Sequence, residues 1–138
     1  MAYTAHATTT AGRNGHVETS DGLIKLDLSV PKELGGPGKP GGSNPEALFA
    51  AGYSACFGSA IEFLAGQEKV KHGPVTVTAD VTIDMTPEKG FFLAVVLRPK
   101  IEGVDQATAQ HLANRAHEDV CPYSKATRGN IDVKIEAA

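Results

Sequence analysis

The stretch Asn44-Pro-Glu-Ala-Leu-Phe-Ala-Ala-Gly-Tyr-Ser-Ala-Cys-Phe57 begins an apolar segment around which the rest of this chain can be arranged. Asn44 is a favoured N-cap residue and Pro45 suits the first helical position, so a helix is predicted to begin here. The apolar segment runs from residue 47 to 66, about the length of a membrane-spanning helix. It contains Glu62 and lacks flanking basic or Trp anchors. We therefore interpret it as a central helix covered on several faces, in part by a second subunit.

Short strands are predicted before this helix. The dipeptides Asn14-Gly15 and Asp21-Gly22 favour hairpin turns. Residues 23–30 alternate between apolar and polar side chains, with one face formed by Ile24, Leu26, Leu28 and Val30. The glycine- and proline-rich segment 35–42 favours neither helix nor strand, so it is predicted to be a loop leading into the helix. The N-terminal third should thus be a meander of strands.

The pattern after the central helix predicts a second hairpin followed by helices. Every odd residue from Val75 to Met85 is apolar and every even one is Thr or Asp, which is typical of a half-buried strand. Residues 91–98 should return beside it, Asp105 should cap a helix running to about residue 119, and Pro122 should begin a shorter one. A last strand alternates around Ile131, Val133 and Ile135.

This order predicts an α+β fold: hairpins without regular β-α-β crossovers favour a mostly antiparallel sheet, covered on one face by the central helix and its companions. At 138 residues, the chain is expected to be one domain, residues 1–138. The formal charge of −3 argues against nucleic acid or an anionic membrane as partner and favours a small molecule. The first ten residues carry no secretory signal pattern, so a reducing cytoplasm is the expected location.

The two cysteines lie in different local settings. Cys56, within the apolar helix, is expected to be sheltered. Cys121 precedes Pro122 and should lie at a helix start, where free amide groups and the helix dipole favour a thiolate. In a reducing compartment two cysteines are more often ordinary buried thiols than a redox pair, and from placement alone both interpretations stay open.

Metal and phosphate sites are not indicated. The five histidines, at positions 6, 16, 72, 111 and 117, form no zinc-ligand spacing with a cysteine. The loop 35–42 matches neither the Walker nor the dinucleotide-binding pattern. No metal and no cofactor is expected.

Three blocks together resemble a known family: NPEALFAAGYSACF at 44–57, VCPYSKATRGNI at 120–131 and GRNGH at 12–16. They resemble the organic hydroperoxide resistance proteins of bacteria, within the Ohr/OsmC superfamily, and the resemblance covers essentially the whole chain. It implies an Ohr/OsmC-like fold, an intertwined homodimer, and a cysteine-based peroxidase that reduces organic hydroperoxides without metal, haem or flavin. It also implies that a dihydrolipoyl group, rather than thioredoxin, reduces the resulting disulfide.

The resemblance also assigns residue roles. Cys56 matches the peroxidatic cysteine, Cys121 the resolving one, Arg13 the catalytic arginine and Glu46 the carboxylate that orients it. Without the family, Arg13 would be a solvated turn residue and Glu46 an acidic residue of a first helical turn. A buried thiol does need a cation to ionise at neutral pH, and an arginine keeps its charge.

Two points about this site stay open in the sequence. Ten residues separate Glu46 from Cys56, about 15 Å of rise in a straight helix, so either the pair reaches Cys56 across a dimer or the helix breaks. Phe49, Tyr53 and Phe57 could form an apolar substrate pocket, although core packing explains these residues equally well.

Two alternatives remain: a peroxidase of the OsmC branch induced by osmotic stress, with the same cysteines, and a non-catalytic binding domain of the same fold. Tyr123, Arg13 and the loop 35–42 favour the hydroperoxide resistance branch. Relative activity on hydrogen peroxide would separate the two enzymatic readings, and inert thiols would indicate the binding domain.

Overall fold

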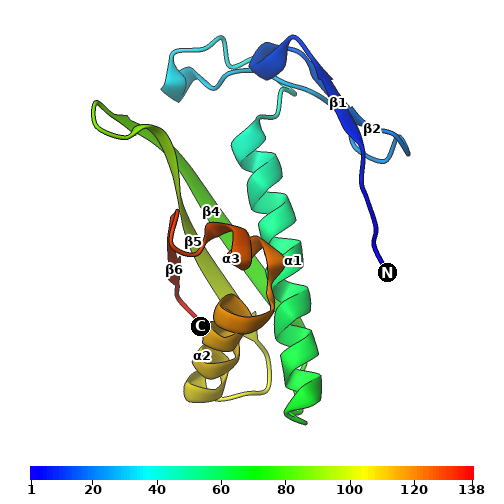
Figure 1. The fold of residues 1–138 in the computed structure, drawn as a ribbon, viewed down its shortest axis with the longest axis vertical. Coiled ribbons are helices and arrows are strands. Elements are labelled where there is room, and N and C mark those ends of the chain that lie inside the picture. Colours follow the sequence, from blue (N-terminus) through cyan, green and yellow to red (C-terminus); the bar gives the residue numbers. More distant parts are fainter. The chain divides into compact units, whose positions relative to one another are not determined.

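The computed structural model describes all 138 residues, which form two compact units: residues 1–48 (unit 1) and residues 49–138 (unit 2). In unit 1 the strands are β1 (Ala7–Thr10), β2 (His16–Thr19) and β3 (Lys25–Asp27) (Figure 1). The helix α1 (Pro45–Gln67) begins at the end of unit 1 and continues into unit 2. Unit 2 then contains β4 (Val75–Thr86), β5 (Gly90–Ile101), α2 (Gln106–Arg115), α3 (Pro122–Thr127) and β6 (Asp132–Ile135). The predicted α+β class is confirmed; the single domain stays a prediction.

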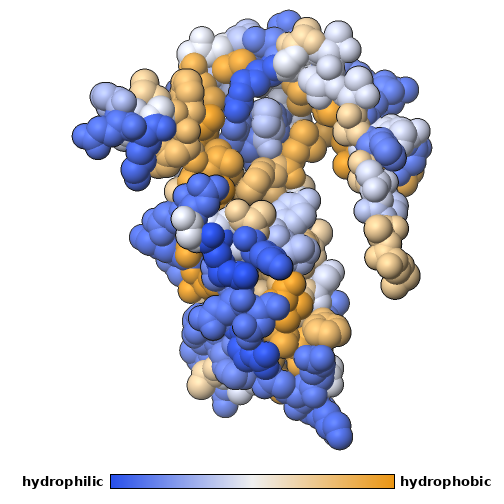
Figure 2. Space-filling view, in the orientation of Figure 1, coloured by the Kyte–Doolittle hydropathy of each residue, from blue (hydrophilic) through white to orange (hydrophobic).

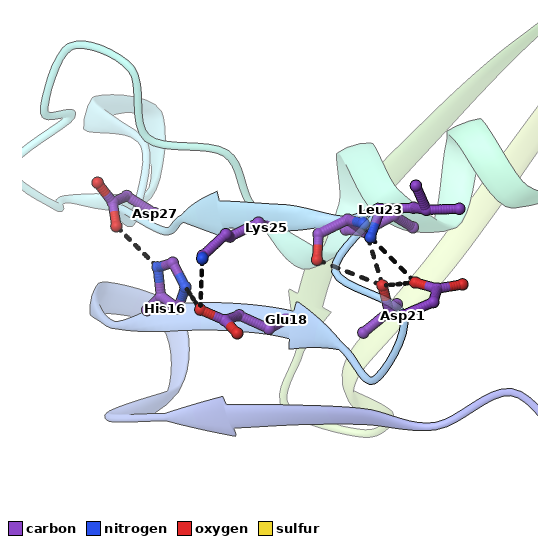
Figure 3. Close-up of polar contacts among 8 residues, drawn as sticks. His16, Glu18, Asp21, Leu23, Lys25 and Asp27 are labelled. Atoms are coloured by element: carbon purple, nitrogen blue, oxygen red, sulfur yellow. Dashed lines mark hydrogen bonds and ion pairs between the residues drawn. The ribbon is translucent and has the colours of Figure 1, made fainter.

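Unit 1 is an antiparallel meander, as its hairpin dipeptides predicted. The sheet order is β1-β2-β3, with Thr10 opposite His16 and Val17 opposite Leu26. The β2–β3 pair carries a polar face on which His16 contacts Glu18 and Asp27 (Figure 3).

The predicted strand over residues 23–30 is shorter than expected. β3 has three residues, and Leu23 and Ile24 are 86% and 43% exposed in the turn before it. Asp21 explains the later start of the strand, because its Oδ1 accepts hydrogen bonds from the backbone N–H of Leu23 and the hydroxyl of Thr19. This side-chain bonding closes a turn at the positions where the alternation predicted a strand.

The sheet of unit 2 is built on the β4–β5 hairpin, whose two strands pair antiparallel over their full length, from Val75 opposite Ile101 to Thr86 opposite Gly90. The third strand, β6, lies parallel to β5. In this register the alternating apolar residues of β4 lie on the same face as Leu93, Val95 and Leu97 of β5 and as Val133 and Ile135 of β6, because side chains alternate with period two. That face packs against the helices in one hydrophobic core, whose members include Tyr53, Phe57, Ile61, Leu64, Val95, Leu97, Leu112 and Cys121.

Helix α1 begins as predicted: the Asn44 carboxamide oxygen accepts a hydrogen bond of 2.8 Å from the Ala47 N–H. The helix is long and apolar enough to cross a membrane. However, four of its side chains, Tyr53, Phe57, Ile61 and Leu64, are fully buried in the core of unit 2. Hydrophobic side chains also reach the surface along α1 (Figure 2), where Phe63 is 55% exposed.

The segment before α3 departs from the prediction. Asp105 caps α2 through a 2.7 Å hydrogen bond from the Thr108 N–H, as expected. The helix expected to run to about residue 119 is α-helical only to Arg115 and continues as a π-helix, η3 (Ala116–Val120). The Cys121 N–H closes it by donating to the Ala116 carbonyl at 2.8 Å. Turns of this wider kind occur often at functional sites.

Candidate active site

The two cysteines of unit 2 lie side by side. The sulfur atoms of Cys56, on α1, and Cys121, at the start of α3, are 3.6 Å apart, and both residues are free thiols. The sulfur–sulfur bond of a disulfide is about 2.05 Å long, so an approach of about 1.5 Å would join them. Residues that are sixty-five positions apart in sequence are thus brought within reach of one covalent bond.

The expected difference in burial between the two thiols is wrong. Cys121 is 1% exposed and belongs to the hydrophobic core, whereas Cys56 is only partly buried. Cys121 does precede Pro122 at the start of α3, as predicted. The π-helix before it, however, sets the direction of the chain there, and the side chain packs into the core.

The electrostatics of Cys56 within unit 2 favour its protonated form. Burial raises the pKa of the Cys56 thiol, and the neighbouring Cys121 adds to the increase. The backbone N–H of Tyr123 acts in the opposite direction and lowers the pKa by hydrogen bonding. Tyr123 can approach because Gly52 faces it: a Cβ added there would lie 3.0 Å from the Tyr123 hydroxyl oxygen. A cation from outside this neighbourhood would be needed to make the thiolate the main form.

A shallow, mostly apolar pocket of about 350 Å³ opens at Cys56. Besides Cys56 it is lined by Ser59, Ala60, Phe63, Val120 and Pro122. None of these five residues was predicted from the sequence. Helical spacing could have found the first three, because positions three, four and seven after Cys56 share its side of α1. Val120 and Pro122 flank Cys121 and could be placed only once the two cysteines were known to meet.

The residues predicted to form a substrate pocket do not line this one. The rings of Tyr53 and Phe57 are fully buried in the core of unit 2. Phe49 is partly buried and stacks edge-on against Tyr53, with ring centroids 5.9 Å apart. Aromatic residues one helical turn apart form a continuous packed column, which accounts for their spacing.

In unit 1, Arg13 and Glu46 form a bidentate ion pair. The two guanidinium nitrogens of Arg13 donate to the two carboxylate oxygens of Glu46 at 2.9 and 2.7 Å. Arg13 lies in the turn η1 (Gly12–Asn14), and the close approach of the chain at Gly15 leaves no room for a side chain, since an added Cβ would lie 1.7 Å from the Thr10 carbonyl oxygen. This planar pairing fixes the orientation of the guanidinium.

The charge state of the pair is well defined. The hydrogen bonds from Arg13 lower the pKa of Glu46, so the carboxylate is ionised at neutral pH. Glu46 also lies in the first turn of α1, where the helix dipole favours a negative charge. Arg13 is 40% exposed, so the guanidinium keeps a face open to a further anionic group.

The four predicted site residues therefore occur as two pairs, one in each unit. α1 is unbroken from Pro45 to Gln67, so the alternative in which the helix breaks before Cys56 is wrong. About 15 Å of helical rise separates Glu46 from Cys56 along α1. No group of three or more His, Cys, Asp or Glu side chains in the structure could hold a metal ion.

Comparison with known proteins defines the class to which this fold and these paired thiols belong. Residues 36–136 match the model of the family described as OsmC-like protein. The chain belongs to this OsmC-like family.

The more similar relatives belong to one branch of it. The organic hydroperoxide resistance protein of Xanthomonas axonopodis pv. citri is 50% identical over 137 residues, covering 99% of this chain and 94% of that protein. A crystal structure of an organic hydroperoxide resistance protein from Legionella pneumophila is 54% identical, with a TM-score of 0.91 and coverage of 99% and 97%. One from Vibrio cholerae, with captopril bound in one of its active sites, is 47% identical, with a TM-score of 0.89 and coverage of 99% and 92%. The resemblance to the organic hydroperoxide resistance proteins is confirmed.

Proposed function

We propose that this protein is an organic hydroperoxide reductase that uses Cys56 and Cys121. The similarity to organic hydroperoxide resistance proteins supports a role in resistance to such peroxides. The observation that carries the finer proposal is the 3.6 Å separation of the two free thiols beside an apolar pocket. Two thiols at this distance can store two oxidising equivalents as a disulfide without a metal, haem or flavin.

In the first step the Cys56 thiolate attacks the terminal oxygen of the hydroperoxide. The oxygen–oxygen bond breaks, Cys56 becomes a sulfenic acid, and the alkoxide that leaves takes a proton and is released as an alcohol. Cys56 suits this role better than Cys121, because it is the more exposed of the two and lines the pocket. The apolar lining favours an organic hydroperoxide over hydrogen peroxide.

Arg13 supplies the cation that the Cys56 thiol needs, and Glu46 holds its guanidinium in one orientation. The bidentate pair and the open face of Arg13 support this assignment. Because α1 is unbroken between Glu46 and Cys56, we propose that the pair of one subunit serves the thiol of the other in a homodimer. The apolar surface of α1, including the half-exposed Phe63, supports burial against a second subunit.

In the second step Cys121 resolves the sulfenic acid. Its sulfur bonds to the Cys56 sulfur, the sulfur–oxygen bond breaks, and the hydroxide combines with the Cys121 proton as water. A dithiol of the dihydrolipoyl type then reduces the disulfide and returns both thiols. A reducing cytoplasm is the compartment in which such a cycle operates.

The test is a titration of fully reduced protein with one equivalent of cumene hydroperoxide, with free thiols counted and any disulfide mapped by mass spectrometry. Wild-type protein should lose both thiols into a Cys56–Cys121 disulfide. The variant Cys121→Ser should consume one equivalent and carry a sulfenic Cys56, which a second equivalent would overoxidise to the sulfinic acid. Survival of both thiols in the wild-type protein would leave a binding domain without peroxidase chemistry.

A competing titration with hydrogen peroxide separates the two enzymatic branches. A clear preference for cumene hydroperoxide supports the organic hydroperoxide reductase. Equal or faster reaction with hydrogen peroxide would overturn the substrate class and point to the osmotically induced branch.

A further inference from the structure

A chain of hydroxyl groups crosses the apolar core of unit 2 beside the thiol pair. The Tyr53 hydroxyl, from α1, lies 2.8 Å from the Ser124 Oγ and 3.0 Å from the Thr127 Oγ1, both on α3. The Ser124 Oγ also lies 2.7 Å from the Nδ1 of His117, on η3. The side chains of Tyr53, Ser124 and Thr127 are all at most 2% exposed. We refer to Tyr53, Ser124, Thr127 and the His117 that contacts Ser124 as the hydroxyl network.

Every buried hydroxyl of the network has a hydrogen-bond partner, as in a specific arrangement and unlike a set of chance contacts. The Thr127 hydroxyl also donates to the Ser124 carbonyl at 3.1 Å, and no buried side-chain nitrogen or oxygen atom in the structure lacks a partner. Buried hydroxyls destabilise a core unless each is paired, so a network closed in this way constrains the positions of all its members. A core built from Leu and Phe at the same positions would pack without any such constraint.

The constrained element is the one that carries Cys121. Ser124 and Thr127 lie three and six residues after it, and His117 lies four residues before it. Its own backbone is held on both sides, with its N–H donating to Ala116 and its carbonyl accepting from Lys125. α3 has six residues, too few to hold a helical conformation by itself. Its place against α1 therefore depends on tertiary contacts such as those from Tyr53.

We propose that the hydroxyl network positions Cys121 for the resolving step, and that Tyr53, Ser124 and Thr127 are positioning residues for formation of the Cys56–Cys121 disulfide. This inference rests on the proposed function. The Cys121 sulfur must close from 3.6 Å to bonding distance and attack in line with the sulfur–oxygen bond of the sulfenic acid. Tyr53 lies three residues, or about one helical turn, before Cys56 on α1. The same helix therefore carries both Cys56, which Cys121 must reach, and the Tyr53 hydroxyl that holds the element of Cys121. The first step, attack of Cys56 on the peroxide, does not involve this network.

The inference predicts that the two steps respond differently to loss of one hydroxyl. Tyr53→Phe removes only the oxygen that joins α1 to α3, and Thr127→Val removes a hydroxyl at nearly constant volume. Single-turnover reactions with cumene hydroperoxide, quenched with acid and analysed by mass spectrometry, give the rate of Cys56 oxidation and the rate of disulfide formation separately. We expect Cys56 oxidation within about twofold of wild type and disulfide formation slowed about tenfold, less than the roughly hundredfold that a misplacement of 1 Å can cost. Cys56 sulfinic acid should accumulate at excess peroxide.

Three controls separate positioning from general stability. Thr127→Ser keeps the hydroxyl and should restore fast disulfide formation relative to Thr127→Val. Ser54→Ala removes a hydroxyl beside Tyr53 whose only bond is to the Ala51 carbonyl of its own helix, and should leave both rates unchanged. Thermal unfolding of each reduced variant shows whether it is folded, and if Tyr53→Phe is not, the two Thr127 variants carry the test.

Disulfide formation at the wild-type rate in folded Tyr53→Phe and Thr127→Val would overturn the inference, and so would equal slowing of both steps. Failure of the proposed function looks different, because the wild-type protein itself would then form neither sulfenic acid nor disulfide.

Discussion

Units 1 and 2 differ in what holds them together and in the chemistry they carry. Unit 1 buries two hydrophobic residues, Val17 and Leu28, and its sheet is joined largely by backbone hydrogen bonds and polar pairs. Every other buried hydrophobic residue lies in unit 2, in one continuous core. The cation and its carboxylate belong to unit 1, whereas both thiols and their pocket belong to unit 2.

The difference shows how one chain can place a charged pair and a pair of thiols in separate units. A short meander with two buried hydrophobic residues is too small to be stable by burial alone, so unit 1 needs cover from elsewhere. Unit 2 has a core that holds two thiols at a fixed separation but, by burying them, raises the pKa of Cys56. The charged pair lies on a polar scaffold and the thiols lie in an apolar one, and the proposed mechanism requires the guanidinium of one subunit to reach the thiol of the other.

The largest effect should come from the core of unit 2. Leu64 is fully buried, so Leu64→Ala is expected to lower the free energy of unfolding by about 3 kcal/mol through lost burial and a cavity. Leu34 in unit 1 is 45% exposed, so Leu34→Ala should change the free energy of unfolding by no more than about 0.5 kcal/mol. Urea unfolding at one protein concentration measures both. Equal losses would break the comparison and mean that Leu34 is buried against another subunit in solution.

The next prediction tests whether Arg13 of unit 1 in one subunit serves Cys56 of unit 2 in the other. Arg13→Ala should slow Cys56 oxidation about a hundredfold, the usual cost of removing one group that stabilises charge in a reaction. Cys56→Ser should be inactive. Dimers formed from equal amounts of both variants should regain about a quarter of wild-type activity, because half of them would be mixed and each would hold one complete site of two.

Lys25→Ala is the matched control for Arg13→Ala, since it removes an exposed cation from the same unit. It should leave activity unchanged. Mixed dimers no more active than the Arg13→Ala protein alone would contradict a site shared between subunits and would place all four residues in one chain.

A smaller effect concerns the ion pair of unit 1. Glu46→Gln should lower the free energy of unfolding at pH 7 by about 1 kcal/mol or less, because the pair is partly exposed. Arg13 lowers the pKa of Glu46 in the folded protein, so the pair stabilises the fold above the ordinary glutamate pKa of about 4.3. That contribution is lost as the pH falls through the lowered value. Urea unfolding should therefore show the free energies of unfolding of the wild-type and Glu46→Gln proteins converging in acid. A difference that stays constant with pH would mean that the charge of Glu46 is not its source.

The smallest effect is expected at His117 in unit 2. Burial lowers the pKa of this histidine, Arg128 lowers it further, and Glu118 acts in the opposite direction. The unfolded state then binds a proton more readily than the folded one, so stability should fall as the pH drops below about 6.5. His117→Asn keeps a hydrogen-bonding group near the Nδ1 position and should remove this part of the pH dependence. Unfolding curves between pH 5 and pH 8 measure it; an unchanged slope would assign the dependence to other groups.

Much of the fold could be predicted from short-range patterns. The caps at Asn44 and Asp105, the β4 strand and the start of α3 at Pro122 all depend on residues within a few positions of one another. The predicted strand at residues 23–30 was wrong in length, and the helix expected to reach residue 119 changes to a π-helix at Ala116. In both places a local hydrogen bond or a tertiary contact competes with the periodic pattern.

The sequence named candidate site residues but not their arrangement. The family blocks named Cys56, Cys121, Arg13 and Glu46, and the structure pairs Cys56 with Cys121 and Arg13 with Glu46. The sequence suggested that Cys56 was the sheltered thiol, whereas Cys121 is the buried one. It also suggested Phe49, Tyr53 and Phe57 as a pocket, although the pocket at Cys56 has other walls. Neighbours in sequence say little about exposure when a residue is covered by an element far along the chain.

The sequence by itself determined the secondary-structure order, the helix caps, the family and the residue types of the candidate site, because these depend on local periodicity and residue type. Only the tertiary structure decided which thiol is exposed, which residues line the pocket, that β6 runs parallel to β5, and that Tyr53 joins α1 to the helix of Cys121. These features depend on which helices and strands pack together although they are far apart in the sequence. Burial is a property of the packed pair and not of either segment alone.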